Sequence, residues 1–340
     1  MDKFVIHGGR KLNGSVKISG SKNGSLPVLF STLLSDGPVH LSNIPTELRD
    51  IRLSLEILQS LGAEYQIHPD GSVMLEVTDS ASTTADYEQV SKMRASICCL
   101  GPLLARRGEA RVSLPGGCSI GDRPVELHTR GMEALGAEVR IESGYVVAKA
   151  PHLRGNTVYL SGPMGPTVLG TQNVMMAAAG AEGVTVIEGA ACEPEVQATA
   201  GFLRAIGIVI EGDGTPVIRI EGHGRLGGDS CLAGCDYEIP PDRIETGTYL
   251  LAGAIAGGEV VVEGCRPSEN SALLDLLERI GVPVEVGEST LTVRGVESVT
   301  PVDIAMLPYP AFPTDLQGPL MALMCLGRGV SLITDKVFPD

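Results

Sequence analysis

One short segment of the sequence combines a thiol, an arginine and a glycine-rich turn. It reads Leu114-Pro-Gly-Gly-Cys-Ser-Ile-Gly-Asp-Arg-Pro124, after a strand-like Arg111-Val-Ser-Leu. Pro124 suits the first position of a helix that continues to about Leu135. Cys118 therefore lies just before an expected helix N-terminus, where the helix dipole and Arg123 both favour the thiolate. The segment predicts a reactive cysteine, although a small apolar side chain on a turn would give the same pattern.

Two further segments place positive charge at expected helix starts. Ser21-Lys-Asn-Gly-Ser25 precedes an apolar run, and either Ser21 or Asn23 can cap the helix there. Free N–H groups at this helix end, together with Lys22, would bind an anion. Arg94 lies at the polar start of a helix that becomes apolar through Leu104. Solvated surface side chains would explain either segment equally well.

Two acidic segments also precede expected helices. Tyr309-Pro-Ala-Phe-Pro-Thr-Asp-Leu-Gln317 is a loop shaped by prolines, in which Asp315 is either a helix N-cap or a carboxylate held as a general base. Pro241-Asp-Arg-Ile-Glu-Thr-Gly-Thr248 is similarly dense in charge, and we interpret it as a capping and ion-pair cluster.

The remaining cysteines do not predict further chemistry. Those in apolar helical or strand contexts, typical of buried thiols, are Cys98, Cys99, Cys192, Cys265 and Cys325. Cys231 and Cys235 lack a second close pair of ligands, so the sequence predicts no metal site.

The elements that must position these side chains recur along the chain. A glycine followed by an alternating apolar stretch occurs at residues 37, 108, 183, 258 and 329, at intervals of 71, 75, 75 and 71 residues. An amphipathic helix follows each of the first four stretches and ends at a glycine, namely Gly62, Gly136, Gly207 and Gly281. A second alternating strand follows each helix. The pattern predicts repeated α/β modules of about 70 residues, packed as pseudo-symmetric domains.

The fifth repeat differs from the others because the sequence stops at Asp340, directly after its first strand. A module cut at this point would leave a strand edge and an apolar face unburied. We therefore expect the chain to be a fragment.

Composition limits the classes of function. The 340 residues carry 26 Lys and Arg against 41 Asp and Glu, a formal charge of −15, and the length suggests about two domains. Such charge argues against a nucleic-acid or anionic-membrane surface. Only 4% of residues are aromatic and tryptophan is absent, which argues against base stacking. No apolar run approaches a membrane span, and Met1-Asp-Lys-Phe4 lacks the apolar core of a signal peptide, so we expect a cytoplasmic protein.

Taken together, the motifs resemble one known family. The strings that carry the resemblance, in order, are Ser19-Gly-Ser-Lys-Asn-Gly-Ser-Leu-Pro27, Lys92-Met-Arg-Ala-Ser96, Leu114-Pro-Gly-Gly-Cys-Ser-Ile-Gly121, Arg123-Pro-Val-Glu-Leu-His128, Pro241-Asp-Arg-Ile-Glu-Thr-Gly-Thr248 and Pro310-Ala-Phe-Pro-Thr-Asp-Leu-Gln317. They closely resemble the UDP-N-acetylglucosamine 1-carboxyvinyltransferases, enolpyruvyl transferases of the EPSP synthase superfamily, and the resemblance covers the whole chain.

This resemblance implies a fold and a domain organisation. The expected fold is the inside-out α/β barrel, with two globular domains of repeated βαβ-type units and an active site in the cleft between them. The implied domains are residues 22–234, which carry the cysteine loop, and residues 1–21 plus 235–340, which lack the C-terminal repeat of the family.

The resemblance also implies a reaction and a set of site residues. The enolpyruvyl group of phosphoenolpyruvate would be transferred to the 3-hydroxyl of UDP-N-acetylglucosamine with release of phosphate, and the reaction would need no metal or cofactor. The partners would be these two small molecules, with no nucleic acid and no membrane. By resemblance Cys118 is the general acid and Asp315 the base. The implied phosphoenolpyruvate contacts are Lys22, Asn23, Arg94 and Arg123. The implied nucleotide-sugar contacts are Arg94, Arg123, Pro124, Val125, Glu126, Leu127, Thr167, Val168, Asp315 and Val337, and His128 closes that motif.

The sequence departs from the family pattern in the loop Gly162-Pro-Met-Gly-Pro-Thr-Val-Leu-Gly170, which lacks the usual lysine, and at Glu126, where aspartate is common. Two alternatives stay open. The sister enzymes that act on shikimate 3-phosphate share the fold and the phosphoenolpyruvate chemistry, although the Cys118 loop and the Arg123–His128 string favour the first assignment. A non-catalytic nucleotide-sugar binder is the second alternative, against which the joint presence of Cys118, Lys22, Arg94 and Asp315 argues.

Overall fold

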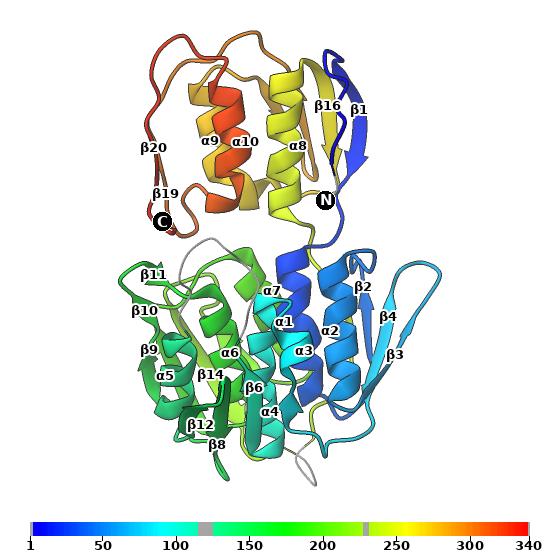
Figure 1. Ribbon diagram of the computed structural model, residues 1–340, viewed down its shortest axis with the longest axis vertical. Coiled ribbons are helices and arrows are strands. Elements are labelled where there is room, and N and C mark those ends of the chain that lie inside the picture. The colour runs from blue at the N-terminus through cyan, green and yellow to red at the C-terminus, as the bar shows by residue number, and fades with distance from the viewer. Residues whose placement is uncertain (1–2, 115–124, 227–230, 339–340) are drawn as a thin grey trace. The chain divides into compact units, whose positions relative to one another are not determined.

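The computed structural model describes residues 3–114, 125–226 and 231–338. The chain divides into two compact units (Figure 1). The smaller unit combines Met1–Ser19 with Pro241–Val337, and the larger combines Gly20–Pro240 with Phe338–Asp340. Each unit is built from the repeated module that the glycine spacing predicts.

In the larger unit, a buried helix, a strand, an amphipathic helix and a β-hairpin follow one another three times among the described residues. The first repeat contains α1 (Lys22–Ser31), η1 (Thr32–Leu34), β2 (Val39–Ser42), α2 (Arg49–Ser60), β3 (Ala63–Ile67) and β4 (Val73–Val77). The second contains α3 (Tyr87–Val90), the 3-10 helix η2 (Arg94–Cys99), α4 (Leu100–Arg107), β6 (Glu109–Ser113), α5 (Glu126–Ala134), β7 (Glu138–Glu142) and β8 (Tyr145–Lys149). The third contains α6 (Val168–Ala179), β12 (Glu182–Glu188), α7 (Pro194–Ala205), β13 (Val209–Glu211) and β14 (Val217–His223).

Each repeat forms a small sheet whose first strand gains a parallel partner from elsewhere in the chain. These partners are β15 (Asp236–Glu238) for β2, β5 (Thr84–Ala85) for β6 and β9 (Thr157–Tyr159) for β12. Strand β15 follows the third repeat yet pairs with the first repeat, so it links the two ends of the larger unit. Every sheet among the described residues is open, in orders such as β15-β2-β4-β3.

Helices, rather than strands, occupy the interior of the larger unit. Residues Gly24–Ser31 of α1 and Gly170–Ala179 of α6 are all buried, and a helix that is apolar on every side belongs in a core. Small residues permit this packing, since a Cβ on Gly101 of α4 would lie 2.2 Å from the Asn173 carbonyl oxygen of α6. Strands such as β2 and β8 alternate between buried and partly exposed positions. The expected α/β class with repeated units is therefore confirmed, and the described part of the chain contains no closed barrel of strands.

The smaller unit contains one whole module and the beginning of another. The whole module comprises β1 (Leu12–Lys17), α8 (Arg243–Ala256), β16 (Gly258–Glu263), η3 (Pro267–Asn270), α9 (Ser271–Arg279), β17 (Val284–Val286) and β18 (Thr290–Arg294). Strand β1 pairs in parallel with β16 across most of the sequence length. The other elements are β19 (Ile304–Met306), η4 (Thr314–Leu316), α10 (Gln317–Met324) and β20 (Ile333–Asp335), with β19 parallel to β20. The sequence predicts a strand directly after Gly329, whereas the observed strand begins at Ile333, where it pairs with β19.

The glycines predicted to end the four amphipathic helices all have positive φ. The angles are 91° at Gly62, 92° at Gly136, 110° at Gly207 and 87° at Gly281. A side chain with a Cβ is strained in this region, whereas glycine adopts it freely. The prediction that these helices end at glycines is therefore confirmed.

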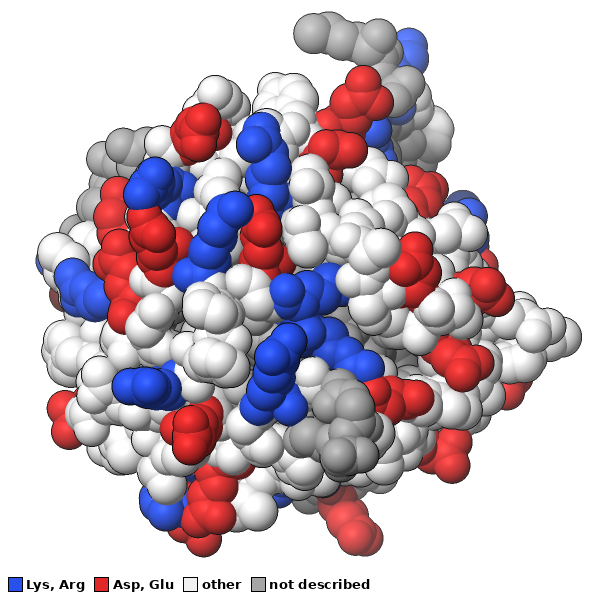
Figure 2. Space-filling model, turned by 90° about the horizontal axis from the view of Figure 1, so that it is seen from below, with Lys and Arg blue, Asp and Glu red and all other residues white. Residues whose placement is uncertain are grey.

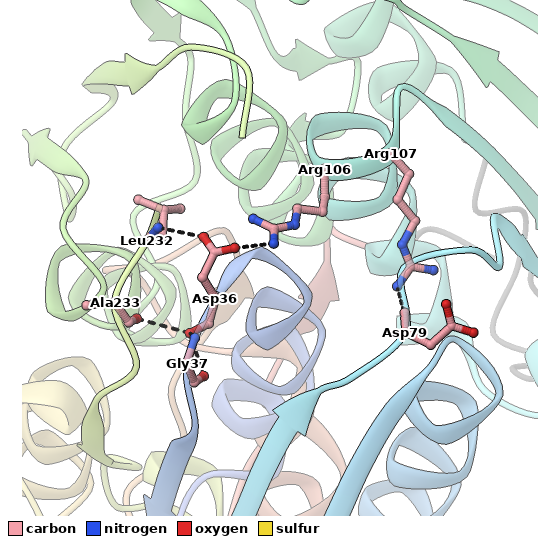
Figure 3. A network of polar contacts seen from close by, with 8 residues as sticks. Asp36, Gly37, Asp79, Arg106, Arg107, Leu232 and Ala233 are labelled. Carbon is pink, nitrogen blue, oxygen red and sulfur yellow. Dashed lines mark hydrogen bonds and ion pairs between the residues drawn. The ribbon is translucent and has the colours of Figure 1, made fainter. Parts of the chain in front are cut away.

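A polar network joins the end of α4 to neighbouring loops (Figure 3). Arg106 forms an ion pair with Asp36, which also accepts a 2.8 Å hydrogen bond from the Leu232 N–H. The Arg106 guanidinium holds the pKa of Asp36 below its usual value, and the Leu232 N–H acts in the same direction while burial opposes both. Arg107 donates to the carbonyl oxygens of Leu61 and Asp79.

On one face of the molecule, a group of Lys and Arg side chains lies among acidic ones (Figure 2), so positive charge is concentrated locally despite the net charge of −15.

Candidate functional site

The first turn of α1 carries Lys22 and Asn23. The Ser21 hydroxyl oxygen accepts a 3.0 Å hydrogen bond from the Gly24 N–H, so the predicted N-cap is confirmed at Ser21. The Lys22 ammonium lies 3.6 Å from the Asp50 carboxylate, and both side chains remain partly exposed, at 43% and 36%. An exposed ion pair of this kind contributes little to stability.

Arg94 begins the 3-10 helix η2, which continues directly into α4. The helix start predicted here is confirmed, with a tighter first segment than an α-helix. The Ser96 hydroxyl donates a 3.0 Å hydrogen bond to the Val90 carbonyl oxygen and so fixes this turn to the preceding α3. Helix η2 contacts both α1 and α6, so Arg94 belongs to the same helical cluster as Lys22.

The predicted nucleotide-sugar residues of the larger unit lie at the starts of α5 and α6. Val125 is buried, Glu126 is exposed and Leu127 is partly buried. Leu127 packs on the short hairpin of β10 (Ser161–Gly162) and β11 (Gly165–Pro166), since its Cδ1 would lie 3.5 Å from a Cβ on Gly162. This hairpin leads directly into α6, so the two helix starts are neighbours.

Thr167 is the N-cap of α6, because its hydroxyl oxygen accepts a 3.2 Å hydrogen bond from the Gly170 N–H. Val168 is the first residue of that helix, and the next residue, Leu169, offers its carbonyl oxygen at 3.9 Å from the Cys98 sulfur of η2. The first turn of α6 is therefore packed against the helix that begins at Arg94.

Asn173 of α6 connects these helix starts from within the core. Its side-chain oxygen accepts a 2.7 Å hydrogen bond from the Gly101 N–H of α4. Its amide nitrogen lies 3.0 Å from the Ile97 carbonyl oxygen of η2 and 3.0 Å from His128 Nδ1 of α5. Both side chains are buried, Asn173 completely and His128 to 2% exposure. No motif in the sequence singles out Asn173, because a lone asparagine within an apolar helix does not by itself predict its partners.

Burial lowers the pKa of His128 to about 3, and the positive charge of Arg94 acts in the same direction. The imidazole is therefore neutral at physiological pH. Asn173 links His128 to η2, the helix that Arg94 begins, so the guanidinium and the imidazole belong to the same cluster of helices.

In the smaller unit, Asp315 lies within η4 and is exposed. Leu316, rather than Asp315, occupies the N-cap position of α10, so the capping interpretation of Asp315 is wrong. The neighbouring Thr314 hydroxyl donates a 2.5 Å hydrogen bond to Asp335 Oδ2, and the Val337 N–H donates a 2.8 Å hydrogen bond to Asp335 Oδ1. Asp335 thus joins the segments of two predicted site residues, although the sequence analysis did not single it out.

The charged segment Pro241–Thr248 is the capping cluster that its composition predicts. Asp242 caps α8 by accepting hydrogen bonds of 2.8 and 2.9 Å from the Ile244 and Glu245 N–H groups. The Glu245 carboxylate accepts from both the N–H and the hydroxyl of Ser19, at 3.0 and 2.5 Å. These bonds fix the position at which the chain leaves the smaller unit.

The described cysteines fit the prediction only in part. Cys98, Cys99 and Cys265 are buried, and burial raises the pKa of all three thiols, that of Cys99 to about 12. Cys192 is half-buried, whereas Cys325 is exposed at the end of α10, so its assignment as a buried thiol is wrong. The reactive candidate Cys118 lies outside the described residues, as do Arg123 and Pro124.

The structure thus distributes the described site residues over both units. The larger unit holds Lys22, Asn23, Arg94, Val125, Glu126, Leu127, Thr167 and Val168. The smaller unit holds Asp315 and Val337. In the described part of the chain, no helix is both long enough and apolar enough to cross a bilayer.

Comparison with known proteins places this arrangement in a family. The profile of EPSP synthase (3-phosphoshikimate 1-carboxyvinyltransferase) matches residues 6–339. The chain is 47% identical over 342 aligned residues to UDP-N-acetylglucosamine 1-carboxyvinyltransferase 2 of Carboxydothermus hydrogenoformans. It is 45% identical over 340 residues to UDP-N-acetylglucosamine 1-carboxyvinyltransferase of Desulfosudis oleivorans. Each alignment covers 100% of this chain and 79% of the relative.

Solved structures share the fold at lower identity. The enolpyruvyl transferase NikO of Streptomyces tendae superposes with a TM-score of 0.86 at 24% identity, over 97% of this chain and 77% of the other. EPSP synthase of Acinetobacter baumannii superposes with a TM-score of 0.66 at 19% identity, over 96% of this chain and 74% of the other. On the family match and the whole-chain identities, this chain belongs to the EPSP synthase family and, within it, to the UDP-N-acetylglucosamine 1-carboxyvinyltransferases.

Proposed function

We propose that this chain transfers the enolpyruvyl group of phosphoenolpyruvate to the 3-hydroxyl of UDP-N-acetylglucosamine and releases phosphate. The observation that carries this proposal is 45–47% identity, over the whole chain, to relatives named for this reaction. The reaction begins peptidoglycan precursor synthesis. Its partners are the two small molecules, and its compartment is the cytoplasm.

The chemistry is an addition followed by an elimination. The 3-hydroxyl oxygen bonds to C2 of phosphoenolpyruvate, while C3 receives a proton and the hydroxyl loses one. Phosphate then leaves C2, and C3 gives up a proton, which restores the double bond in the product. These steps need a general acid, a general base and positive charge around the phosphate.

We assign these roles to residues of both units. Cys118 is the general acid and Asp315 the base that faces the sugar hydroxyl. Lys22, Asn23, Arg94 and Arg123 bind phosphoenolpyruvate. The nucleotide sugar is bound by Arg94, Arg123, Pro124, Val125, Glu126, Leu127, Thr167, Val168, Asp315 and Val337. The exposure of Asp315, and the position of Lys22 in the first turn of α1, support their roles.

Phosphate release with alternative acceptors tests the reaction. We expect release from phosphoenolpyruvate when UDP-N-acetylglucosamine is the acceptor and none above background with shikimate 3-phosphate. The reverse preference would assign the chain to the sister activity.

Alkylation by the epoxide fosfomycin tests the general acid. We expect one adduct in the intact-protein mass, mapped to Cys118 and enhanced by UDP-N-acetylglucosamine. Cys118→Ser should abolish this adduct, whereas Cys325→Ser, which removes an exposed thiol, should leave it. Binding of the nucleotide sugar without an adduct or turnover would favour a non-catalytic binder.

A further inference from the structure

The hydrogen bonds of Asn173 determine the orientation of its own side chain. The Gly101 N–H can only donate, so the Asn173 atom 2.7 Å away is the amide oxygen. The Ile97 carbonyl oxygen can only accept, so the atom 3.0 Å away is the amide nitrogen. In a flipped amide, the Asn173 NH₂ group would face the Gly101 N–H, donor against donor. Its oxygen would face the Ile97 carbonyl oxygen, acceptor against acceptor. The assignment of nitrogen and oxygen is therefore unambiguous.

This orientation determines where His128 carries its proton. One hydrogen of the Asn173 amide nitrogen is directed to Ile97, and the other lies toward His128 Nδ1, 3.0 Å away. Nδ1 must accept this hydrogen, so it carries no proton of its own. The proton of the neutral ring is then on Nε2, on the side of the imidazole away from Asn173.

The surroundings of His128 oppose a second proton. A protonated Nδ1 would face the amide N–H of Asn173, donor against donor. The ring is 2% exposed, so a charge on it would be poorly solvated. Among the described residues, the charged group that acts on His128 is Arg94, which also disfavours a cation.

We infer that Asn173 is a positioning residue that holds His128 as a neutral imidazole with its proton on Nε2. The Nε2–H group then donates a hydrogen bond to an anionic oxygen of the substrates. Arg94 attracts such an oxygen to this neighbourhood, and the helix start that contains His128 also carries Glu126 and Leu127. The imidazole then adds a directed donor without adding charge. The role as donor rests on the proposed function, whereas the protonation state does not.

The protonation state is measured directly on the chain without substrates. Two-dimensional ¹H–¹⁵N spectra of ¹⁵N-histidine protein distinguish the two neutral forms and the cation, and loss of one signal in His128→Gln assigns it. We expect the Nε2–H pattern for His128, unchanged from pH 8 to pH 5. An Nδ1–H pattern, or a titration near pH 6.5, would overturn the inference even if the chain is an active transferase.

The role of Asn173 is tested by Asn173→Asp. A carboxylate oxygen in place of the amide nitrogen accepts a hydrogen bond from Nδ1–H, so we expect Nδ1 of His128 to carry a proton at pH 7 in the same spectra. An unprotonated Nδ1 in a folded Asn173→Asp protein would contradict the inference. If this variant does not fold, the wild-type spectra and the following pair of variants still decide the question.

The role as donor is tested by two substitutions of similar size. The amide of His128→Gln reaches the position of Nε2 and can donate there, whereas that of His128→Asn reaches only the position of Nδ1. We expect kcat/KM to fall less than threefold in His128→Gln and about 10- to 100-fold in His128→Asn, as for the loss of a hydrogen bond to a charged group. Equal losses in two folded variants would show that His128 serves packing alone.

Separate additions of phosphoenolpyruvate and UDP-N-acetylglucosamine identify the oxygen concerned. A shift of the Nε2–H signal with phosphoenolpyruvate indicates its phosphate or carboxylate, and a shift with the nucleotide sugar indicates the diphosphate. No shift with either, in a chain that turns both substrates over, would refute the donor role while leaving the proposed function intact.

Discussion

The Thr314 hydroxyl donates a 2.5 Å hydrogen bond to the Asp335 carboxylate. This bond attaches the 3-10 helix η4, which contains Asp315, to strand β20. Asp335 also accepts a hydrogen bond from the Val337 N–H. A carboxylate that is not itself a proposed catalytic group therefore holds two proposed substrate contacts in register.

We expect Asp335→Ala to raise KM for UDP-N-acetylglucosamine about tenfold with little change in kcat, because it removes two hydrogen bonds to a carboxylate. Steady-state kinetics measure this effect. The matched control is Asp303→Ala, which removes a 2.8 Å bond from the Leu332 N–H at the opposite end of the same strand pair. A similar rise in KM in both variants would mean that Asp335 only stabilises the strands.

We expect Ser21→Ala to lower the free energy of unfolding by about 1 kcal/mol and to raise KM for phosphoenolpyruvate, since the cap orders the turn that carries Lys22. Denaturant titration and kinetics measure the two effects. Ser31→Ala, at the other end of α1, removes a 2.8 Å bond to the Pro27 carbonyl oxygen and should leave KM unchanged. An unaltered KM in Ser21→Ala would argue against a role for this turn in binding.

We expect Gly101→Ala to destabilise the larger unit by several kcal/mol, because the added methyl would meet Asn173 Oδ1 at 2.6 Å and its carbonyl oxygen at 2.2 Å. Thermal unfolding measures the loss. Gly318 is also the second residue of a helix, but it is exposed and has no atom within 4 Å of an added Cβ, so Gly318→Ala should be neutral or stabilising by up to about 1 kcal/mol. A well-folded Gly101→Ala protein would show that α4 and α6 can separate.

We expect His128 to make stability depend on pH. Its pKa is about 3 in the folded chain, mainly through burial, and about 6.5 in the unfolded chain. Between these values the unfolded state binds the proton, so this contribution to stability is complete above pH 6.5 and is lost as the pH falls toward 3. Compared with His128→Gln, the wild-type free energy of unfolding should fall by an additional amount of about 1.4 kcal/mol per pH unit between pH 6 and pH 4. Parallel curves for the two proteins would indicate an ordinary, solvated histidine.

Local sequence pattern predicted the repeated module and the ends of its amphipathic helices. It also gave Ser21 as one of two possible caps and Pro241–Thr248 as a capping cluster. These features depend on neighbouring residues, since a glycine with positive φ or a capping oxygen acts within one turn of chain. The same local reasoning located Lys22, Arg94 and Asp315 at the starts of helices or loops, and family resemblance supplied their chemistry.

Which of these residues lie close together depends on tertiary packing. Local pattern does not predict that β1 pairs with β16, that Asn173 bonds three different helical segments, or that Asp335 holds Thr314 and Val337. It also misassigned Asp315 as a possible cap and Cys325 as buried. Such contacts join residues far apart in sequence, and their partners are determined by how the core packs rather than by local preference.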